Sequence, residues 1–509
     1  MKKALTVLIL LLLMFFFGKE FIHKPSTHIP EPSQASDTDI NIQIKTENMP
    51  KKNIYQIEVD YDGKNIILGN MNIKYYNKSD RTHTNLFFHM YANIFKSRNH
   101  LPFFSEDLSK VFPQGFNPGG LEVLEAVQEG KPIQWTLEED DQILQINLKD
   151  AVKPGNHTDI FIKFRLTLPN ANFRLGYQQF GHDKITTSLG NWYPILAVFE
   201  NGEWILDTHC SMGDPGYSDI SDYNVEFTTP LRFTVAASGI LSNHVTEGNK
   251  EIYNYVAENV RDFAAAISNN YEIAEDMVDG IKIISYFHPE DSKGGFMALD
   301  TVKHALKIFN DSFGKYPYDE LRIAEANYYC GGMEYPTFIM MNTGKYKEPN
   351  LSNTSLERST AHEVAHQWWY GVVGNNQVRE SWIDEGLTEF STAYYFEKRY
   401  GEAGREAYFE RYVDTARNII QNSTMKMYDP LPQFKIRGEY FPVVYINGML
   451  FYDSLRSQID DEHFFYLLKT YYEKYKYKNV NMVQLIKFLK ERTQDVLDDT
   501  FFEKWFSLE

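Results

Sequence analysis

The alternation of apolar and polar residues divides this chain into a strand-rich first part and a helix-rich second part. From about residue 40 the dominant period is two. In segment 160–168 every second residue is apolar, which is typical of a strand with one face on a core. Asp62-Gly63 and Pro154-Gly155 indicate turns between neighbouring strands. The pattern predicts an antiparallel β domain over residues 40–270.

Helical periodicity becomes dominant after about Tyr271. A strand at 281–287 precedes a helix at 296–313, and after residue 354 nearly every segment has the helical period. These patterns predict a second domain over residues 271–509, mainly helical with a small sheet. The fold class is therefore multidomain, β followed by α+β. Further helices are expected at 402–420, 463–475 and 482–491.

The most informative segment is a predicted helix that carries His362, Glu363 and His366. Thr354 and Glu357 form a capping-box pattern at the start of this helix, and Gly371 is typical of the position after a helix ends. Two histidines four residues apart lie on one face of a helix, so their ring nitrogens can bind one Zn²⁺. The glutamate between them is directed toward the same cavity.

A second helix is expected from about Ser381 to Gly401, and it carries Glu385 nineteen positions after His366. Two histidines and a distant glutamate form the ligand set of a catalytic zinc site, whose fourth position is left for water. The sequence thus predicts one Zn²⁺ per chain, held by His362, His366 and Glu385.

Composition narrows the function further. The chain has 509 residues, 43% of them hydrophobic, so it can bury more than one core. A net charge of −18 argues against a nucleic-acid partner. The two cysteines, Cys210 and Cys330, could form one disulfide, but their spacing does not decide whether they pair.

The first residues resemble an export signal. Lys2 and Lys3 precede an apolar stretch, and residues 1–23 are predicted to be a signal peptide or a membrane anchor. Residues 24–39 contain three prolines among polar residues and are predicted to be a disordered tether. We therefore expect an extracytoplasmic protein, membrane-anchored or secreted, and the sequence leaves cleavage of the segment open.

Two further features can contribute to a peptide-binding site. Gly331 and Gly332 allow a backbone strand to approach a bound peptide closely, and Glu334, after Met333, can neutralise a free ammonium group. The phenol of Tyr445 could donate a hydrogen bond to a developing oxyanion near zinc. Taken alone, the first feature is more often an ordinary turn, and a tyrosine such as the second is far more often a packing residue.

Together, the His-Glu-x-x-His motif, Glu385 on the next helix and the stretch 331–334 resemble the aminopeptidase N family of gluzincins. The resemblance implies a thermolysin-like catalytic domain and a role for each motif residue. It implies that His362, His366 and Glu385 bind zinc and that Glu363 is the general base. It also implies that the stretch Gly331, Gly332, Met333 and Glu334 binds the substrate, with Glu334 as the anchor of its amino group. Tyr445 is implied to stabilise the transition state.

The chain also departs from the family pattern. Tyr335 replaces the usual asparagine after the anchoring glutamate, and of the usual residues after the catalytic tyrosine only Gly448 is kept. Tyr440 matches a second tyrosine of the family. Because the chain ends at Glu509, the resemblance implies a short form without the large C-terminal helical domain of many relatives.

The function expected from these features is zinc-dependent removal of the N-terminal residue from peptides that have a free amino terminus. One alternative is a thermolysin-type endopeptidase. Another is a non-enzymatic, membrane-tethered peptide-binding or scaffold protein. An oligomer is compatible with the sequence but is not indicated by it.

The N-terminal segment yields a first prediction. The full chain should be recovered in the membrane fraction, with its body accessible from outside the cytoplasm, because the two lysines favour a cytoplasmic N-terminus. A chain that starts at residue 40 should be released. Fractionation and protease accessibility test this, and recovery of the full-length chain solely from the cytosol would contradict it.

Overall fold

The computed structural model describes residues 51–347 and 355–506, which belong to one compact unit, Lys51–Glu509. Within these residues, no helix has the length and apolar character needed to cross a membrane. The predicted signal or anchor (1–23), the tether (24–39) and the predicted helix cap Thr354 lie outside the described residues.

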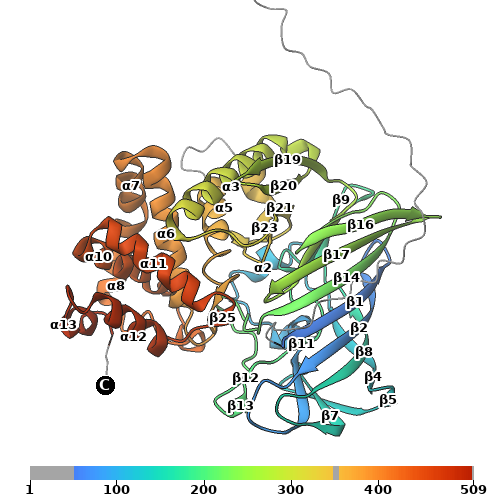
Figure 1. The fold of residues 1–509 in the computed structure, drawn as a ribbon. Helices are drawn as coiled ribbons and strands as arrows, with labels where there is room; N and C mark the ends of the chain where they lie inside the picture. The colour runs from blue at the N-terminus through green and yellow to red at the C-terminus, as the bar shows by residue number, and fades with distance from the viewer. Residues whose placement is uncertain (1–50, 348–354, 507–509) are drawn as a thin grey trace, which may run out of the picture. The chain divides into compact units, whose positions relative to one another are not determined.

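The N-terminal part is built on an eight-stranded sheet with the order β16-β17-β14-β1-β2-β8-β4-β5 (Figure 1). Alternate residues of β8 (His157–Thr167) are buried, as the two-residue period predicts. The expected turns are present, with positive φ at Gly63 and Gly155. The other strands are β1 (Asn53–Tyr61), β2 (Ile66–Tyr76), β4 (Gly120–Gln128), β5 (Lys131–Pro132), β14 (Ser221–Pro230), β16 (Ile240–Glu247) and β17 (Lys250–Val260).

One pairing in this sheet differs from the expected antiparallel arrangement. Strands β1 and β14 pair in parallel, with Asn53 opposite Ser221, while the other neighbours are antiparallel. Parallel neighbours need a long connection between them. Here the intervening strands of the same domain supply it, which the local two-residue period could not reveal.

Smaller β elements complete this part of the molecule. Two four-stranded sheets have the orders β15-β18-β10-β9 and β11-β3-β7-β6, and β12 pairs with β13. Their strands are β3 (His83–His89), β6 (Gln134–Glu138), β7 (Ile143–Val152), β9 (Leu175–Phe180), β10 (Lys184–Leu189), β11 (Ile195–Leu196), β12 (Phe199–Glu200), β13 (Glu203–Trp204), β15 (Thr234–Ala237) and β18 (Ala265–Ser268). Short helices η1 (Tyr91–Phe95), η2 (Arg98–His100) and α2 (Leu108–Val111) lie between the strands in sequence.

A five-stranded mixed sheet begins the second part, with the order β19-β20-β21-β23-β22. The predicted strand at 281–287 is β20 (Ile281–Phe287), and the helix expected at 296–313 begins earlier, as α3 (Ser292–Phe313). The remaining elements are β19 (Glu272–Val278), β21 (Glu320–Ala326), β22 (Gly332–Met333), β23 (Phe338–Asn342), η3 (Pro289–Asp291) and α4 (Thr343–Lys347).

Helices form most of the described chain from residue 355 onward, so the predicted fold class, a β domain followed by a mainly helical α+β part, is confirmed. The motif helix is α5 (Ser355–Ala365) and the next long helix is α6 (Trp382–Tyr400), flanked by Ser381 and Gly401 as predicted. The others are α7 (Glu402–Tyr408), the π-helical turn η4 (Phe409–Val413), α8 (Asp414–Asn422), η5 (Leu431–Gln433), α9 (Arg437–Tyr440), the π-helical turn η6 (Phe441–Ile446), α10 (Asn447–Ile459), α11 (Asp461–Tyr475), α12 (Met482–Thr493) and α13 (Asp499–Glu503), with β24 (Val373–Gly374) and β25 (Lys478–Asn479).

Two glycines allow helices α6 and α10 to approach closely. A Cβ atom added at Gly386 would lie 2.8 Å from the Cα of Gly448, and one added at Gly448 would lie 2.7 Å from the Cα of Gly386. Any larger residue would separate the helices. This contact holds the start of α10, and the π-helical turn before it, against the helix that carries Glu385.

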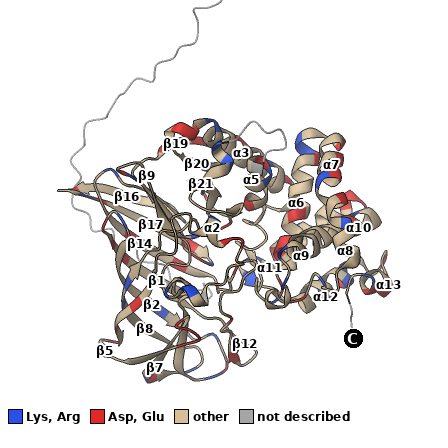
Figure 2. Ribbon diagram, turned by 180° about the vertical axis from the view of Figure 1, so that it is seen from behind, with Lys and Arg blue, Asp and Glu red and all other residues tan. Residues whose placement is uncertain are grey.

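A buried arginine connects the two parts. Arg261 follows β17, and its guanidinium donates hydrogen bonds to the carbonyl oxygens of Tyr370 (2.6 Å), Val372 (3.2 Å) and Lys478 (2.7 Å). These hydrogen bonds join the end of β17 to backbone carbonyls beyond α5, and the carbonyl of Val372 also accepts a hydrogen bond from the backbone nitrogen of Tyr477 (2.8 Å). Elsewhere in the described chain, acidic and basic residues are interspersed over strands and helices (Figure 2).

Candidate metal centre and substrate cavity

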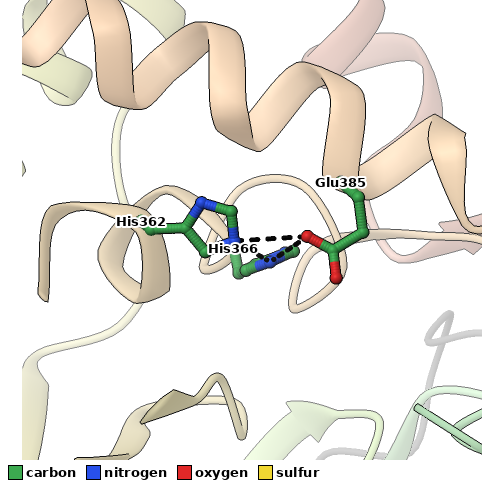
Figure 3. Close-up of side chains that lie close together, drawn as sticks. All are labelled: His362, His366 and Glu385. Carbon is green, nitrogen blue, oxygen red and sulfur yellow. Dashed lines mark hydrogen bonds and ion pairs between the residues drawn. The ribbon is translucent and has the colours of Figure 1, made fainter. Parts of the chain in front are cut away.

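The ends of two helices bring the three predicted zinc ligands together. His362 lies in the last turn of α5, His366 directly follows that helix, and Glu385 lies in the first turn of α6. The Nε2 atoms of both histidines and Oε2 of Glu385 are each 3.2 Å from the other two (Figure 3). Ligand atoms placed 2.0–2.1 Å from a tetrahedral zinc ion would be about 3.3–3.4 Å apart. The three side chains therefore have the spacing of a zinc site.

The hydrogen bonds behind the rings support the same conclusion. Nδ1 of His366 is 2.9 Å from the carbonyl oxygen of Trp369, and Nδ1 of His362 is 3.1 Å from a carboxylate oxygen of Glu389. Both partners accept, so each Nδ1 carries a hydrogen, and in the neutral rings each Nε2 presents a lone pair. Three acceptor atoms then face one another in a buried space, an arrangement that a cation stabilises.

The site attracts positive charge. Although burial lowers the pKa of His362, hydrogen bonds to Glu385 and Glu389 outweigh burial and raise it to about 9. Burial likewise raises the pKa of Glu385, but His366 and His362 outweigh it and lower it to about 2. The cluster thus favours a proton in the metal-free chain or a bound metal ion in its place.

Glu389 is a site residue that the sequence analysis missed. It lies one turn after Glu385 on α6 and accepts two 2.6 Å hydrogen bonds from Nη2 of Arg358 as well as one from the hydroxyl of Tyr408. Burial raises its pKa, but Arg358 and His362 outweigh burial and lower it to about 2. Its i+4 spacing from Glu385 could have indicated this residue in the sequence, because side chains four positions apart share a helix face.

The motif glutamate, Glu363, lies beside the metal cluster and against the edge strand β22. A Cβ atom added at Gly332 would lie 2.6 Å from Oε1 of Glu363 and 2.7 Å from Sδ of Met341, so a side chain at that position would displace one of these groups. At Gly331 the nearest atom would be the Ser359 hydroxyl oxygen at 3.6 Å, which leaves room for a side chain. Of the two predicted glycines, therefore, only Gly332 lies in close contact with the motif glutamate.

Glu334 follows β22 and is buried near His366. One of its carboxylate oxygens belongs to a cluster with His366 and Asp384 whose ligand atoms lie within 4.8 Å of one another. The side-chain nitrogen of Gln377 donates hydrogen bonds to both carboxylates, to Oε1 of Glu334 (3.0 Å) and to Oδ2 of Asp384 (2.9 Å). Burial raises the pKa of Glu334, so a cationic partner would stabilise its charged form.

Tyr445 lies in the π-helical turn η6, which interrupts the α-helical hydrogen bonds before α10. Its hydroxyl donates a 2.5 Å hydrogen bond to Oε1 of Glu385, and its ring is stacked 5.8 Å from that of His362. The second tyrosine, Tyr440, is buried with its ring 5.4 Å from that of Tyr445. The phenol of Tyr445 is therefore adjacent to the metal cluster.

These side chains line one cavity of about 340 Å³. The predicted residues on its wall are Gly331, Gly332, Glu334, His362, Glu363, His366, Glu385, Tyr440 and Tyr445. Met333 is not part of this wall, since its side chain is buried in the core. Cys210 and Cys330 also line the cavity, and both are free thiols.

Comparisons with known proteins identify the class of this domain. Residues 297–505, less than half of the chain, match the Peptidase family M1 domain. The chain is 24% identical over 234 residues to aminopeptidase M1-B of Oryza sativa subsp. japonica, covering 44% of this chain and 26% of that protein. It is 24% identical over 259 residues to endoplasmic reticulum aminopeptidase 1 of Rattus norvegicus, covering 49% of this chain and 27% of that protein. The chain thus matches about a quarter of the length of these curated relatives.

Solved structures show the same fold. The M1 zinc metallopeptidase from Deinococcus radiodurans has a TM-score of 0.62 with 16% sequence identity, over 87% of this chain and 91% of that chain. A structure described as a two domain M1 zinc metallopeptidase, bound to L-arginine, also has a TM-score of 0.62, at 15% identity over 87% of this chain and 90% of that chain.

The domain is that of a zinc metallopeptidase. Within that class, residues 297–505 match the domain of peptidase family M1, in agreement with the predicted resemblance to the aminopeptidase N family and with the predicted zinc cofactor.

The position of Glu389 yields a prediction for metal affinity. Glu389→Gln should weaken zinc binding about 10- to 100-fold, because an outer carboxylate orients the histidine and raises its basicity. Competition with a chromophoric chelator measures this. Glu397→Gln is the matched control, since Glu397 on the same helix also makes a paired contact with an arginine, at 2.6 and 2.8 Å from Arg456. Equal affinity for zinc in the two variants would contradict the orienting role.

Proposed function

We propose that this chain is a zinc-dependent aminopeptidase that removes the N-terminal residue from peptides with a free amino terminus. The observation that carries the proposal is the position of Glu334. Glu334 is 3% exposed, and its carboxylate shares a cluster with His366, a residue of the metal centre. A buried carboxylate next to the metal is suited to binding an α-ammonium group through a charge-assisted hydrogen bond.

The short distance between anchor and metal centre determines which bond is cleaved. In a peptide, the amino nitrogen and the carbonyl carbon of the first residue are separated by only two bonds. The next peptide bond lies about 3.3–3.6 Å further along an extended chain. With the ammonium at Glu334, the first carbonyl group is therefore the one that can reach the centre formed by His362, His366 and Glu385.

Each remaining residue has a role in this proposal. Zn²⁺ bound by His362, His366 and Glu385 would polarise the scissile carbonyl and make water more acidic. Glu363 accepts a proton from the attacking water and transfers it to the leaving amine. Tyr445 donates a hydrogen bond to the oxyanion as it forms, in place of the bond it donates to Glu385.

To act as a base, Glu363 must be a deprotonated carboxylate. Burial raises its pKa to about 8 in the metal-free chain. A dication at the neighbouring ligands would lower this pKa, because a nearby positive charge favours the carboxylate. Metal binding and activation of the base are therefore coupled in this proposal.

The alternatives explain fewer residues. A thermolysin-type endopeptidase would use the same ligands but would leave the buried carboxylate of Glu334 without a cationic partner. A peptide-binding scaffold would give no role to Glu363 or Tyr445. The location of the protein outside the cytoplasm, tethered or secreted, is a separate proposal that rests on the sequence of residues 1–23 alone.

A matched pair of peptides tests the proposal. The enzyme should cleave a free-amine peptide and should barely cleave the N-acetylated form, and Glu334→Gln should reduce the ratio of the two kcat/KM values. Loss of one charged hydrogen bond, worth about 1.5–3 kcal/mol, corresponds to roughly 10- to 150-fold.

Product analysis by mass spectrometry shows which bond is cut. Cleavage of internal bonds in both peptides at equal rates would support the endopeptidase, and absence of zinc-dependent cleavage would support the scaffold. A ratio unchanged by Glu334→Gln would contradict the anchor.

A further inference from the structure

A second buried cluster of metal-binding side chains lies apart from the zinc centre and shares no residue with it. His288 follows β20, Asp291 precedes α3 and Glu325 lies on β21, elements that adjoin one another in Figure 1. Each offers a ligand atom, and these atoms lie within 4.8 Å of one another. The exposed fractions of the three residues are 4%, 8% and 0%. No step of the proposed peptidase reaction uses them.

The hydrogen bonds that Asp291 and Glu325 accept do not neutralise the negative charges of both carboxylates. Glu325 accepts hydrogen bonds from the backbone nitrogen of His288 (2.8 Å) and from the hydroxyl of Thr343. By contrast, Oδ2 of Asp291 is buried and has no hydrogen-bond partner. A buried, unpaired carboxylate oxygen is unfavourable unless it loses its charge or binds a cation.

The proximity of the carboxylates is also reflected in their protonation. Burial raises the pKa of Asp291 to about 6, and the neighbouring Glu325 contributes in the same direction. The positive charge of Lys347 opposes this shift but does not cancel it. Two acidic groups thus compete for too little positive charge, which is the condition that a divalent ion relieves.

His288 is oriented as a ligand. Its Nε2 is 2.9 Å from the hydroxyl of Thr186, which is in turn 2.9 Å from the hydroxyl of Ser268. Without a metal, Nδ1 faces the acceptor Oε1 of Glu325 and carries a hydrogen. When a metal ion takes the place of that hydrogen, Nε2 can donate to Thr186, which in turn donates to Ser268. Nδ1 is 2.9 Å from Oε1 of Glu325, so one small ion can contact both atoms.

We infer that His288, Asp291 and Glu325 form a second metal site that binds a divalent transition-metal ion such as Zn²⁺. One imidazole nitrogen and two carboxylate oxygens suit such an ion, whereas Ca²⁺ prefers a set made only of oxygens. The site is buried, as structural metal sites are.

The ion would join the β20–α3 connection to β21. The chain continues from β21 to β22 and Glu334, so the ion would brace the strand that leads to the substrate anchor.

Metal stoichiometry of the full chain tests this inference. After equilibration with Zn²⁺ and removal of loose metal, mass spectrometry should count two zinc ions per chain in the unmodified protein. His362→Gln, which removes a ligand of the catalytic centre, should retain one. Asp291→Asn should also retain one, with its activity within a few-fold of the unmodified chain. Asp300→Asn, at an exposed acid on α3, is the matched control and should retain two.

Three results would overturn the inference: one zinc ion in the unmodified chain, none in His362→Gln, or two in Asp291→Asn. The first is expected if Asp291 and Glu325 share a proton instead of binding a metal. Circular dichroism verifies that each variant is folded. If Asp291→Asn does not fold, His288→Gln replaces it. If neither folds, the counts for the unmodified chain and His362→Gln still decide the question.

Discussion

The constraint on which the active region depends is the close approach of three buried acceptor atoms. Nε2 of His362, Nε2 of His366 and Oε2 of Glu385 are mutually 3.2 Å apart. Because both Nδ1 atoms donate to fixed acceptors, the lone pairs of the two Nε2 atoms point toward Oε2 of Glu385. Three acceptors this close together are stable only around a positive charge. The ends of α5 and α6 therefore meet at a metal site, and Glu389 and the backbone at Trp369 hold the rings in position.

Two close contacts made by glycine bring the other groups to this centre. Gly332 allows β22 to lie against Glu363, so the strand that precedes Glu334 passes directly beside the zinc helix. Gly386 and Gly448 allow α6 and α10 to touch, which keeps Tyr445 beside Glu385. Packing at these positions thus sets the distances between the proposed anchor, base and oxyanion donor, and a side chain at any of these three glycines would displace a part of the site.

The sequence predicted the features that depend on local spacing. Two histidines four residues apart share a helix face, and the helix that begins after Ser381 places Glu385 in its first turn, so the metal centre could be predicted from pattern alone. The parallel pairing of β1 with β14 could not, because register between strands distant in sequence depends on tertiary contacts. For the same reason no local pattern indicated the roles of Arg261 or Gln377, or the cluster of His288, Asp291 and Glu325.

The most direct measurement of the metal centre is anomalous X-ray diffraction at the zinc absorption edge, on crystals of the full chain equilibrated with zinc. We expect a strong anomalous peak between Nε2 of His362, Nε2 of His366 and the carboxylate of Glu385, about 2.0–2.2 Å from each ligand atom. An empty position between these three side chains in zinc-saturated crystals, or zinc bound by other residues of this cavity, would contradict the assignment of these ligands.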